Sequence, residues 1–470
     1  MVGLFMLVAV PVAMISTGLP AWVVLVGIAF LSSLIGVTTG ILTPSLLTAI
    51  PARIVGLLSD DLLQALPLYV LMGALLNHLP LAQIMFRTWA RALNRTPAGP
   101  TLAGLGLGVM LTPLNGSVGS SVAMLSRTVL PRLDANGVSV ERSAALVCAA
   151  STFGVVIPPS LVLILLGDAL LRAHTEAVNV TKQAVRIINT QDIFLGALLP
   201  AGILFVAYLT LTWWLNRRTA TSTVPQQKPS GRADRWIAIA TTVFILALLA
   251  SVVLGRLYAV EAAATGGMAL VVFGLVTRAL TWSILRNVLR DTMAIAGALF
   301  ALLVAATIFT LVLRGFDTDR LVSAWLVEFG GNGKYAMLFV VLGILALCTF
   351  VLDAFEILFV IIPIIMPPLL IAVPDAVWVA VLTLLVLQTS FLMPPFGYAV
   401  MMVGAVLKRP LGNRKLTQAL LPYVVVQLAV LGLVLIFPNL VWHGDTLDST
   451  RATGAGEIPA QEYLPLEEAK

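Results

Sequence analysis

Uncharged apolar runs near or above ~18 residues recur along this chain, and runs of that length are typical of helices that cross a lipid bilayer. Hydrophobic residues make up 59% of the 470 residues and charged residues 11%, whereas about a quarter of a soluble domain is charged. The runs are apolar on all sides and do not alternate in the ~10-residue segments of a β-barrel. The sequence therefore predicts an all-α polytopic membrane protein embedded in a lipid bilayer.

Basic residues gather in short clusters between the apolar runs. The clusters are Arg87–Arg95, Arg127–Arg142, Arg217–Arg235, Arg278–Arg290 and Lys408–Lys415. Placing all of them in the cytoplasm gives one consistent threading, with the N-terminus and the C-terminal tail outside. Clusters of this kind orient helices, so the net charge of +6 does not predict a nucleic-acid partner. The first run has neither the basic start nor the cleavage site of a signal peptide, so we expect it to stay as a helix.

The chain carries no pattern typical of an enzyme. His78, His174 and His443 are scattered, without nucleophile–base or metal-ligand spacing. Cys148 and Cys348 both lie inside apolar runs and are interpreted as small core residues, without a disulfide or metal role. We therefore expect no catalytic residue and no cofactor.

The apolar run 101–130 is interrupted at its middle by a polar segment, TPLNGSVGSS at 112–121. Each apolar arm of ~12 residues would make about 18 Å of helix, which reaches only the middle of a ~30 Å hydrocarbon core. The pattern predicts a re-entrant helical hairpin with its tip near the midplane. The next span, 143–167, is broken by STFGVVIPPS at 151–160, where adjacent prolines cannot continue a regular helix.

A second interrupted pair repeats the first. The run 335–371 holds Asp353 and Glu356 at its centre, and the run 377–407 is broken by TSFLMPPFG at 389–397. The threading brings the first hairpin in from the cytoplasm and the second from outside, which is the inverted repeat of many secondary transporters. Broken backbone in a bilayer must be buried in protein or line a cavity. We therefore expect each tip to meet its partner break, giving two pseudo-symmetric sites near the midplane.

The broken segments suit ion and anion binding, because helix N-termini hold anions while freed carbonyls and hydroxyls hold cations. Asp353 and Glu356 are the only charges between Lys334 and Asp375, and intramembrane carboxylates are costly and usually functional. Cation or proton coupling is the favoured role for them, and a structural cap at the hairpin tip is the alternative.

These features resemble the large membrane subunit of TRAP (tripartite ATP-independent periplasmic) transporters. The resemblance runs from AVPVA at 9–13 to the last span, and its strongest motifs are NGS at 115–117, STFGVVIPPS at 151–160, EAAA at 261–264, LD at 352–353 and MPPFG at 393–397. It implies an elevator-type transporter of the bacterial inner membrane that imports an organic acid with sodium. It also implies two partners, a small four-helix membrane subunit and a periplasmic solute-binding protein. The chain begins at the start of the large subunit, so we expect no small subunit fused to its front.

The resemblance also implies sodium sites between each hairpin tip and its partner break. The predicted Na+ ligands are Ser120, Ser121, Ser151, Thr152, Asp353, Glu356, Thr389 and Ser390. The predicted substrate-binding residues are Asn115, Gly116, Ser117, Gly154, Pro158, Pro159, Pro394, Pro395 and Gly397. The family usually has an aspartate where Ser121 stands and a small polar residue where Glu356 stands. The insertion 167–192 is similar to the branch of chloroaromatic, mannitol and 2-oxo-acid systems, which favours a monocarboxylate or 2-oxo acid.

Six segments and two alternatives complete the prediction. The segments are N-terminal scaffold helices with an interfacial arm (1–100), the first transport repeat (101–167), an extracytoplasmic loop, scaffold helices and cytoplasmic hinge (168–334), the second transport repeat (335–407), the last span (408–441) and a polar tail (442–470). A stand-alone sodium–dicarboxylate symporter of the related two-hairpin superfamily would transport without partners. A membrane assembly subunit would not transport at all.

Overall fold

The computed structural model describes residues 2–59, 61–93, 95–182, 186–217, 231–330, 333–393, 397–407 and 413–442. Every regular element in these ranges is a helix. Eight of the helices are long and apolar enough to cross a membrane, or nine with the bent pair at residues 65–92. The all-α polytopic fold predicted from the sequence is confirmed.

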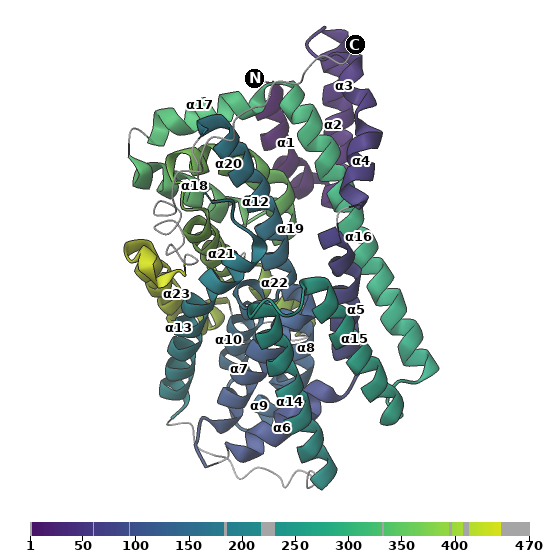
Figure 1. Cartoon of the computed structure of the whole chain (residues 1–470). Coiled ribbons are helices and arrows are strands. Elements are labelled where there is room, and N and C mark those ends of the chain that lie inside the picture. Colours follow the sequence, from purple (N-terminus) through teal and green to yellow (C-terminus); the bar gives the residue numbers. More distant parts are fainter. Residues whose placement is uncertain are drawn as a thin grey trace, which may run out of the picture.

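The order of the helices repeats once along the chain (Figure 1). The first copy contains α5 (Ala65–His78), α6 (Leu81–Ala92), α7 (Gly99–Leu111), η2 (Thr112–Asn115), α8 (Val118–Thr128), α9 (Leu130–Ala135), α10 (Val140–Ser151), α11 (Phe153–Val156), α12 (Leu161–Thr181) and α13 (Thr190–Asn216). The second contains α16 (Trp282–Gly315), α17 (Thr318–Gly330), α18 (Lys334–Cys348), α19 (Ala354–Glu356), the π-helical turn η3 (Ile357–Ile361), α20 (Ile362–Ala372), α21 (Ala376–Leu392), α22 (Tyr398–Val406) and α23 (Asn413–Ile436). The remaining elements are α1 (Val2–Thr17), α2 (Ala21–Thr38), α3 (Pro44–Thr48), α4 (Ile50–Leu58), η1 (Asp61–Gln64), α14 (Arg232–Val253), α15 (Ala259–Val276) and η4 (Pro438–Leu440).

The two hairpins enter from opposite ends of the molecule. The amphipathic helix α6 packs on the first arm α7 at the lower end of Figure 1, and α17 packs on the first arm α18 at the upper end. The first hairpin turns at Gly116, whose φ of 72° favours a residue without a side chain. Its return arm begins where Ser117 Oγ accepts the Ser120 N–H at 3.2 Å. The opposed entry predicted from the threading is confirmed.

The helix that follows each break packs on the hairpin of the other copy. The helix α12 lies along α20, the return arm of the second hairpin, and α22 lies along α8, the return arm of the first. In the same way α10 packs on α23 and α21 packs on α13. These exchanged contacts join the two repeats into a single body, called the core below, which consists of α7 to α13, η2, η3 and α18 to α23.

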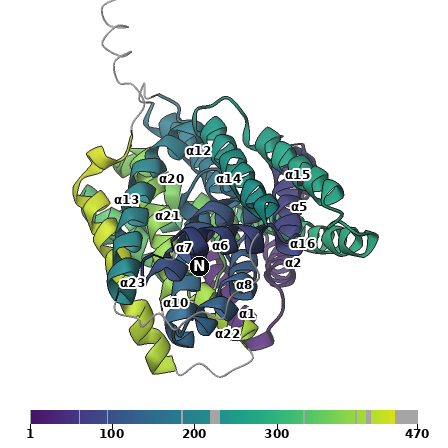
Figure 2. The same ribbon diagram turned by 90° about the horizontal axis from the view of Figure 1, so that it is seen from below.

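A second group of helices, called the flank below, lies beside the core. It contains α2, α5, α15 and α16, in which α16 packs on α2 and α5 and α15 packs on α5. The flank also includes a hydrogen bond between His78 Nε2 and Asp291 Oδ2 at 2.9 Å, which joins α5 to α16. Figure 2 shows α5, α15 and α16 at one edge of the molecule and the core helices α13 and α23 at the opposite edge. The flank contacts both hairpin tips, since α5 touches η2 and α16 touches α19 and η3.

Two segments expected as connections are largely helical. The segment 168–192, expected as a polar loop with a helical stretch, begins with helix, because α12 continues to Thr181. An ion pair between Asp168 and Arg172 at 3.0 Å, four residues apart, stabilises this extension. The basic connection expected at 278–290 is mostly part of α16, which begins at Trp282 after Thr281 Oγ1 caps the Ile284 N–H at 3.4 Å. Amphipathic and charged helical turns resemble loops when only apolar length is counted.

The second hairpin differs from the sequence expectation in length. The first hairpin has arms of 13 and 11 residues, close to the ~12 expected. The second has a first arm of 15 residues and a continuous return segment, Ala354–Ala372, of 19 residues. The argument that short arms place a tip at mid-bilayer therefore holds for the first hairpin and is wrong for the return arm of the second. Most of the expected hinge 217–235 and the tail from residue 443 lie outside the described residues.

Candidate functional site

The first hairpin tip is buried between α5 and α11. A Cβ on Gly73 of α5 would lie 2.6 Å from the Asn115 carbonyl oxygen, and a Cβ on Gly154 of α11 would lie 2.7 Å from the Thr112 carbonyl oxygen. The two glycines therefore let two backbone segments touch the tip directly. The predicted approach of this tip to the break at 151–160 is confirmed.

Oxygen atoms without partners gather around this tip. Thr112 is 2% exposed and Asn115 3% exposed. Within the described part of the chain, Thr112 Oγ1 and Asn115 Oδ1 have no hydrogen-bond partner, and neither does the hydroxyl of Tyr69 on α5. The Asn115 amide nitrogen points instead to Met124 Sδ at 3.7 Å. An unpaired buried polar group costs about 1–3 kcal/mol, so these oxygens are suited to a ligand that accepts lone pairs, as a hard cation does.

The three serines of the first tip are all involved in local hydrogen bonds. Ser117 caps the return arm, and Ser121 Oγ donates to the Ser117 carbonyl at 2.9 Å. Ser120 Oγ accepts from Asn77 Nδ2 at 2.7 Å. A hydroxyl has two acceptor lone pairs, so each serine keeps an acceptor position after these contacts.

The first break contains three buried hydroxyl residues, Ser151, Thr152 and Ser160. Ser151 Oγ donates to the Cys148 carbonyl at 2.8 Å and Thr152 Oγ1 donates to the Ala149 carbonyl at 2.9 Å. After the cis peptide bond between Pro158 and Pro159, Ser160 caps the N-terminus of α12. The break thus presents hydroxyl oxygens on one side and a capped helix N-terminus on the other.

The second tip carries carboxylates in place of unpartnered neutral oxygens. Asp353 precedes α19, and Glu356 Oε2 accepts the Asp353 N–H at 3.0 Å as one half of a capping box. Both side chains are half-buried. The cap expected as the alternative role is therefore present in the structure. Glu356 retains its second carboxylate oxygen for another partner.

The second break mirrors the first in its hydroxyls. Thr389 Oγ1 donates to the Leu385 carbonyl at 2.6 Å and Ser390 Oγ donates to the Val386 carbonyl at 2.9 Å. The Gly397 N–H closes the turn onto the Met393 carbonyl at 2.7 Å. The predicted substrate-binding residues Pro394 and Pro395 lie outside the described residues.

Tyr398 lies beside the return arm of the first hairpin, and sequence reasoning missed it. A Cβ on Gly119 of the first hairpin would lie 2.8 Å from the Tyr398 hydroxyl. Asp353 and Glu356 of the second hairpin are within electrostatic range of the same hydroxyl. The second hairpin packs on its broken helix through α18, which contacts α21. A tyrosine in an apolar run has no sequence pattern that would have marked it.

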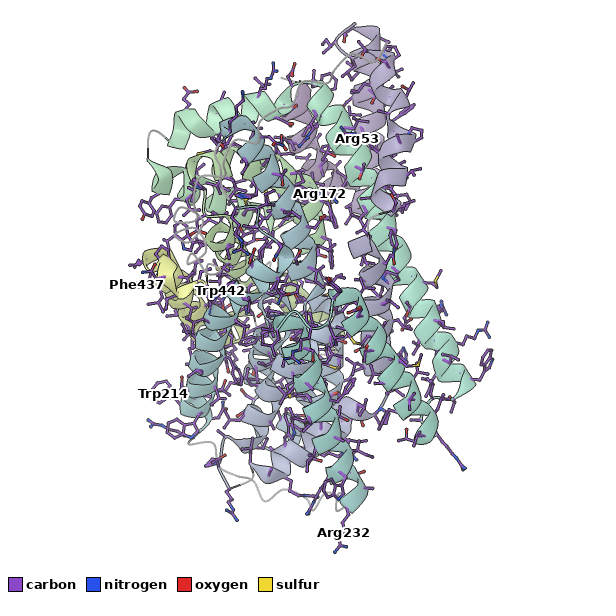
Figure 3. All side chains as sticks on the ribbon, in the orientation of Figure 1. Arg53, Arg172, Trp214, Arg232, Phe437 and Trp442 are labelled. Atoms are coloured by element: carbon purple, nitrogen blue, oxygen red, sulfur yellow. The ribbon has the colours of Figure 1, made fainter. Side chains whose placement is uncertain are left out.

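Two adjoining cavities lie towards the upper end of Figure 1, the first between the core and α16 and the second between α12, α20 and α17. The first has a volume of 570 Å³ and the second 890 Å³. Arg53 of α4 and Arg172 of α12 line the first cavity and are labelled in the upper half of Figure 3, far from Arg232 at the lower end. Arg314 of α16 borders both cavities and pairs with Glu176 at 3.2 Å and Asp319 at 3.1 Å.

An all-helical membrane protein with two opposed hairpins, each turned towards a broken helix, has the architecture of a secondary transporter. The family model described as "Tripartite ATP-independent periplasmic transporter, DctM component" matches residues 7–440. The chain belongs to this family, so it is a TRAP large permease subunit and a multi-pass protein of the bacterial inner membrane.

Characterised relatives are distant but cover most of the chain. The 2,3-diketo-L-gulonate TRAP transporter large permease protein YiaN of Escherichia coli is 22% identical over 380 residues, covering 80% of this chain and 84% of that protein. The C4-dicarboxylate TRAP transporter large permease protein DctM of Pseudomonas aeruginosa is 22% identical over 378 residues, covering 79% and 83%. Among solved structures, the Alcanivorax borkumensis YdaH transporter has the same fold, with a TM-score of 0.56 and 16% identity over 85% of this chain and 89% of that one.

Proposed function

We propose that this permease subunit imports an organic acid together with sodium, in a complex with a small membrane subunit and a periplasmic solute-binding protein. The observation that carries the proposal is the group of buried, unpartnered oxygens at the first tip, Thr112 Oγ1 and Asn115 Oδ1. Thr112 lies against the first break, since a Cβ on Gly154 would come 3.2 Å from the Thr112 Cβ. A cation bound between tip and break would satisfy both oxygens.

Sodium suits this first site better than a proton does. Thr112, Asn115 and the neighbouring serines and threonine carry no group that titrates near neutral pH. Neutral oxygens can therefore hold a metal cation but cannot carry a proton. We assign Ser120, Ser121, Ser151 and Thr152 to this site as additional ligands. Asp353, Glu356, Thr389 and Ser390 form the corresponding set in the second repeat.

The substrate proposed is a small organic anion, bound near the Asn115–Ser117 turn, Gly154, Pro158–Pro159 and the Pro394–Gly397 segment. Relatives are named for 2,3-diketo-L-gulonate, sialic acid, C4-dicarboxylates and isethionate, all of them acids. Helix N-termini beside the breaks, such as that of α12, provide partial positive charge without a buried cationic side chain. The similarity of the 167–192 insertion to 2-oxo-acid systems favours a monocarboxylate or 2-oxo acid.

Transport would proceed by movement of the core against the flank. The exchanged contacts of α12 with α20 and of α22 with α8 hold both hairpins in one body. One direct contact between the core and the flank is the ion pair between Glu176 of α12 and Arg314 of α16, which borders the two cavities. An exposed ion pair contributes only about 0–1 kcal/mol, so breaking it would not prevent such movement.

The test is uptake by proteoliposomes that contain the chain together with its small-subunit and solute-binding-protein partners. A panel of radiolabelled mono-, di- and 2-oxo acids would be offered under an inward sodium gradient. We expect uptake of one class, abolished when potassium replaces sodium at constant pH. Equal uptake in potassium would refute sodium coupling. Uptake by this chain without partners would establish the stand-alone symporter, and no uptake of any acid would favour the assembly subunit.

A further inference from the structure

A network of hydrogen bonds between fully buried side chains runs from the first break to α13. Gln388, Gln427, Thr152 and Tyr208 are each 0% exposed. Uncharged polar side chains buried among membrane helices are stable only when hydrogen-bonded. Each glutamine is a polar residue within an apolar run, so the sequence does not predict these hydrogen bonds.

Within this network each side chain donates to the next one, in the direction from α13 towards the first break. Tyr208 donates to Gln427 Oε1 at 3.2 Å, and Gln427 Nε2 donates to Gln388 Oε1 at 3.0 Å. Gln388 Nε2 then donates to Thr152 Oγ1 at 3.4 Å, and Thr152 donates onward to the Ala149 carbonyl. Each amide uses both its oxygen and its nitrogen, so neither glutamine can be inverted or replaced by an apolar residue without leaving a buried group unpaired.

Gln388 connects the two proposed ion sites. Its amide contacts Thr152, a proposed ligand of the first site. Its backbone directly precedes Thr389 and Ser390, proposed ligands of the second. The link extends to α23, because Gln427 also donates to the Leu385 carbonyl at 3.4 Å and Thr389 donates to that same carbonyl.

We infer that Gln388 is a positioning residue that couples the two sodium sites, so that an ion at one site orders the ligands of the other. The inference rests on the proposed sodium function. An ion that binds Thr152 Oγ1 changes the length of the hydrogen bond from Gln388 Nε2 to that oxygen. Any resulting shift of Gln388 also moves Thr389 and Ser390, which follow it in the same helix. Ordering that one ligand has already imposed lowers the cost for the next, which gives positive cooperativity.

The test needs no knowledge of the organic substrate. Binding of ²²Na+ to the purified full-length chain would be measured against sodium concentration, with choline chloride holding the ionic strength constant. We expect a Hill coefficient between about 1.5 and 2 for the wild type, since two coupled sites cannot exceed two. Gln388→Met, which matches the side-chain length, should lower the coefficient to about 1 while both sites still saturate.

Controls separate coupling from stability. Gln427→Met removes the hydrogen bond that Gln427 Nε2 donates to Gln388 Oε1, and it should also lower the Hill coefficient. Tyr423→Phe removes a hydroxyl that is hydrogen-bonded to Thr212 at 3.0 Å and not to Gln427, Gln388 or Thr152. This variant should leave the Hill coefficient unchanged. Thermal unfolding without sodium checks that each variant is folded. A wild-type coefficient in folded Gln388→Met or Gln427→Met would overturn the coupling role alone, whereas a wild-type chain that binds no sodium would overturn the proposed function as well.

Discussion

The two hairpin tips occupy corresponding places in the repeat but differ in chemistry. The first is neutral and almost fully buried, with Thr112 and Asn115 2% and 3% exposed. The second is half-buried and acidic, with Asp353 and Glu356 in a capping box. The first tip therefore leaves side-chain oxygens for the ion proposed above, whereas the second tip satisfies part of its polarity through its own capping box. The two copies of an inverted repeat can thus share a hairpin geometry although only the second tip carries carboxylates.

The largest effect is expected from the acidic tip. Asp353→Ala should abolish transport without preventing membrane insertion, because removing a carboxylate from a span eases insertion by up to about 2.5–3.5 kcal/mol. Sodium-driven uptake and membrane abundance would be measured side by side. Asp353→Asn is the matched control, since asparagine caps a helix as well as aspartate does. Full activity in Asp353→Asn would show that the cap matters and the charge does not, and a fully active Asp353→Ala would make the residue dispensable.

The next largest effect, a loss of sodium affinity, is expected where the backbone of the neutral tip packs against Gly154. Gly154→Ala would place its Cβ 2.7 Å from the Thr112 carbonyl oxygen, and overpacking of this kind costs about 1–3 kcal/mol. Displacing the tip should lower sodium affinity by at least about tenfold, which corresponds to 1.4 kcal/mol. The measurement is ²²Na+ binding. Gly202→Ala on α13 is the control, because nothing lies within 4 Å of its Cβ; equal affinities in the two variants would contradict the packing argument.

A smaller effect is expected from the unpartnered amide of the neutral tip. Asn115→Ala removes Oδ1, which has no partner among the described residues, so folding stability should change little while sodium affinity falls by about three- to tenfold. Sodium-dependent stabilisation in thermal unfolding reports the affinity directly. A loss of stability in sodium-free buffer, with unchanged sodium dependence, would show that Asn115 has only a packing role.

The smallest effect is expected beside the return arm of the first hairpin. Tyr398→Phe removes the hydroxyl that lies next to Gly119 and is influenced electrostatically by Asp353 and Glu356, but keeps the ring 6.1 Å from that of Phe391. We expect a change of about two- to fivefold in the transport rate, because one hydrogen-bonding group is worth about 0.5–1.5 kcal/mol. Initial uptake rates at saturating sodium would measure it. Identical rates would restrict Tyr398 to packing.

The sequence predicted the tips and breaks because each one interrupts an apolar run with residues that a spanning helix rarely tolerates. It could not predict Gln388, Gln427 or Tyr398, since a single polar residue in an apolar run does not reveal its partner. Thr152 and Gln388 are separated by 236 positions along the chain. Helix length was misjudged for similar reasons, as in α16, whose basic first turns extend a span beyond its apolar part.

The exchanged packing has a consequence for biosynthesis. The return arm of the first hairpin ends at Thr128, yet its packing partner α22 begins only at Tyr398. At about 5–20 residues per second, the ribosome needs between roughly ten seconds and one minute to make the intervening chain. The nascent first half therefore waits in the membrane with an unmatched helix face and a polar tip that still lacks part of its surroundings. A ribosome that stalls within this interval leaves a fragment recognisable to membrane proteases and insertion chaperones.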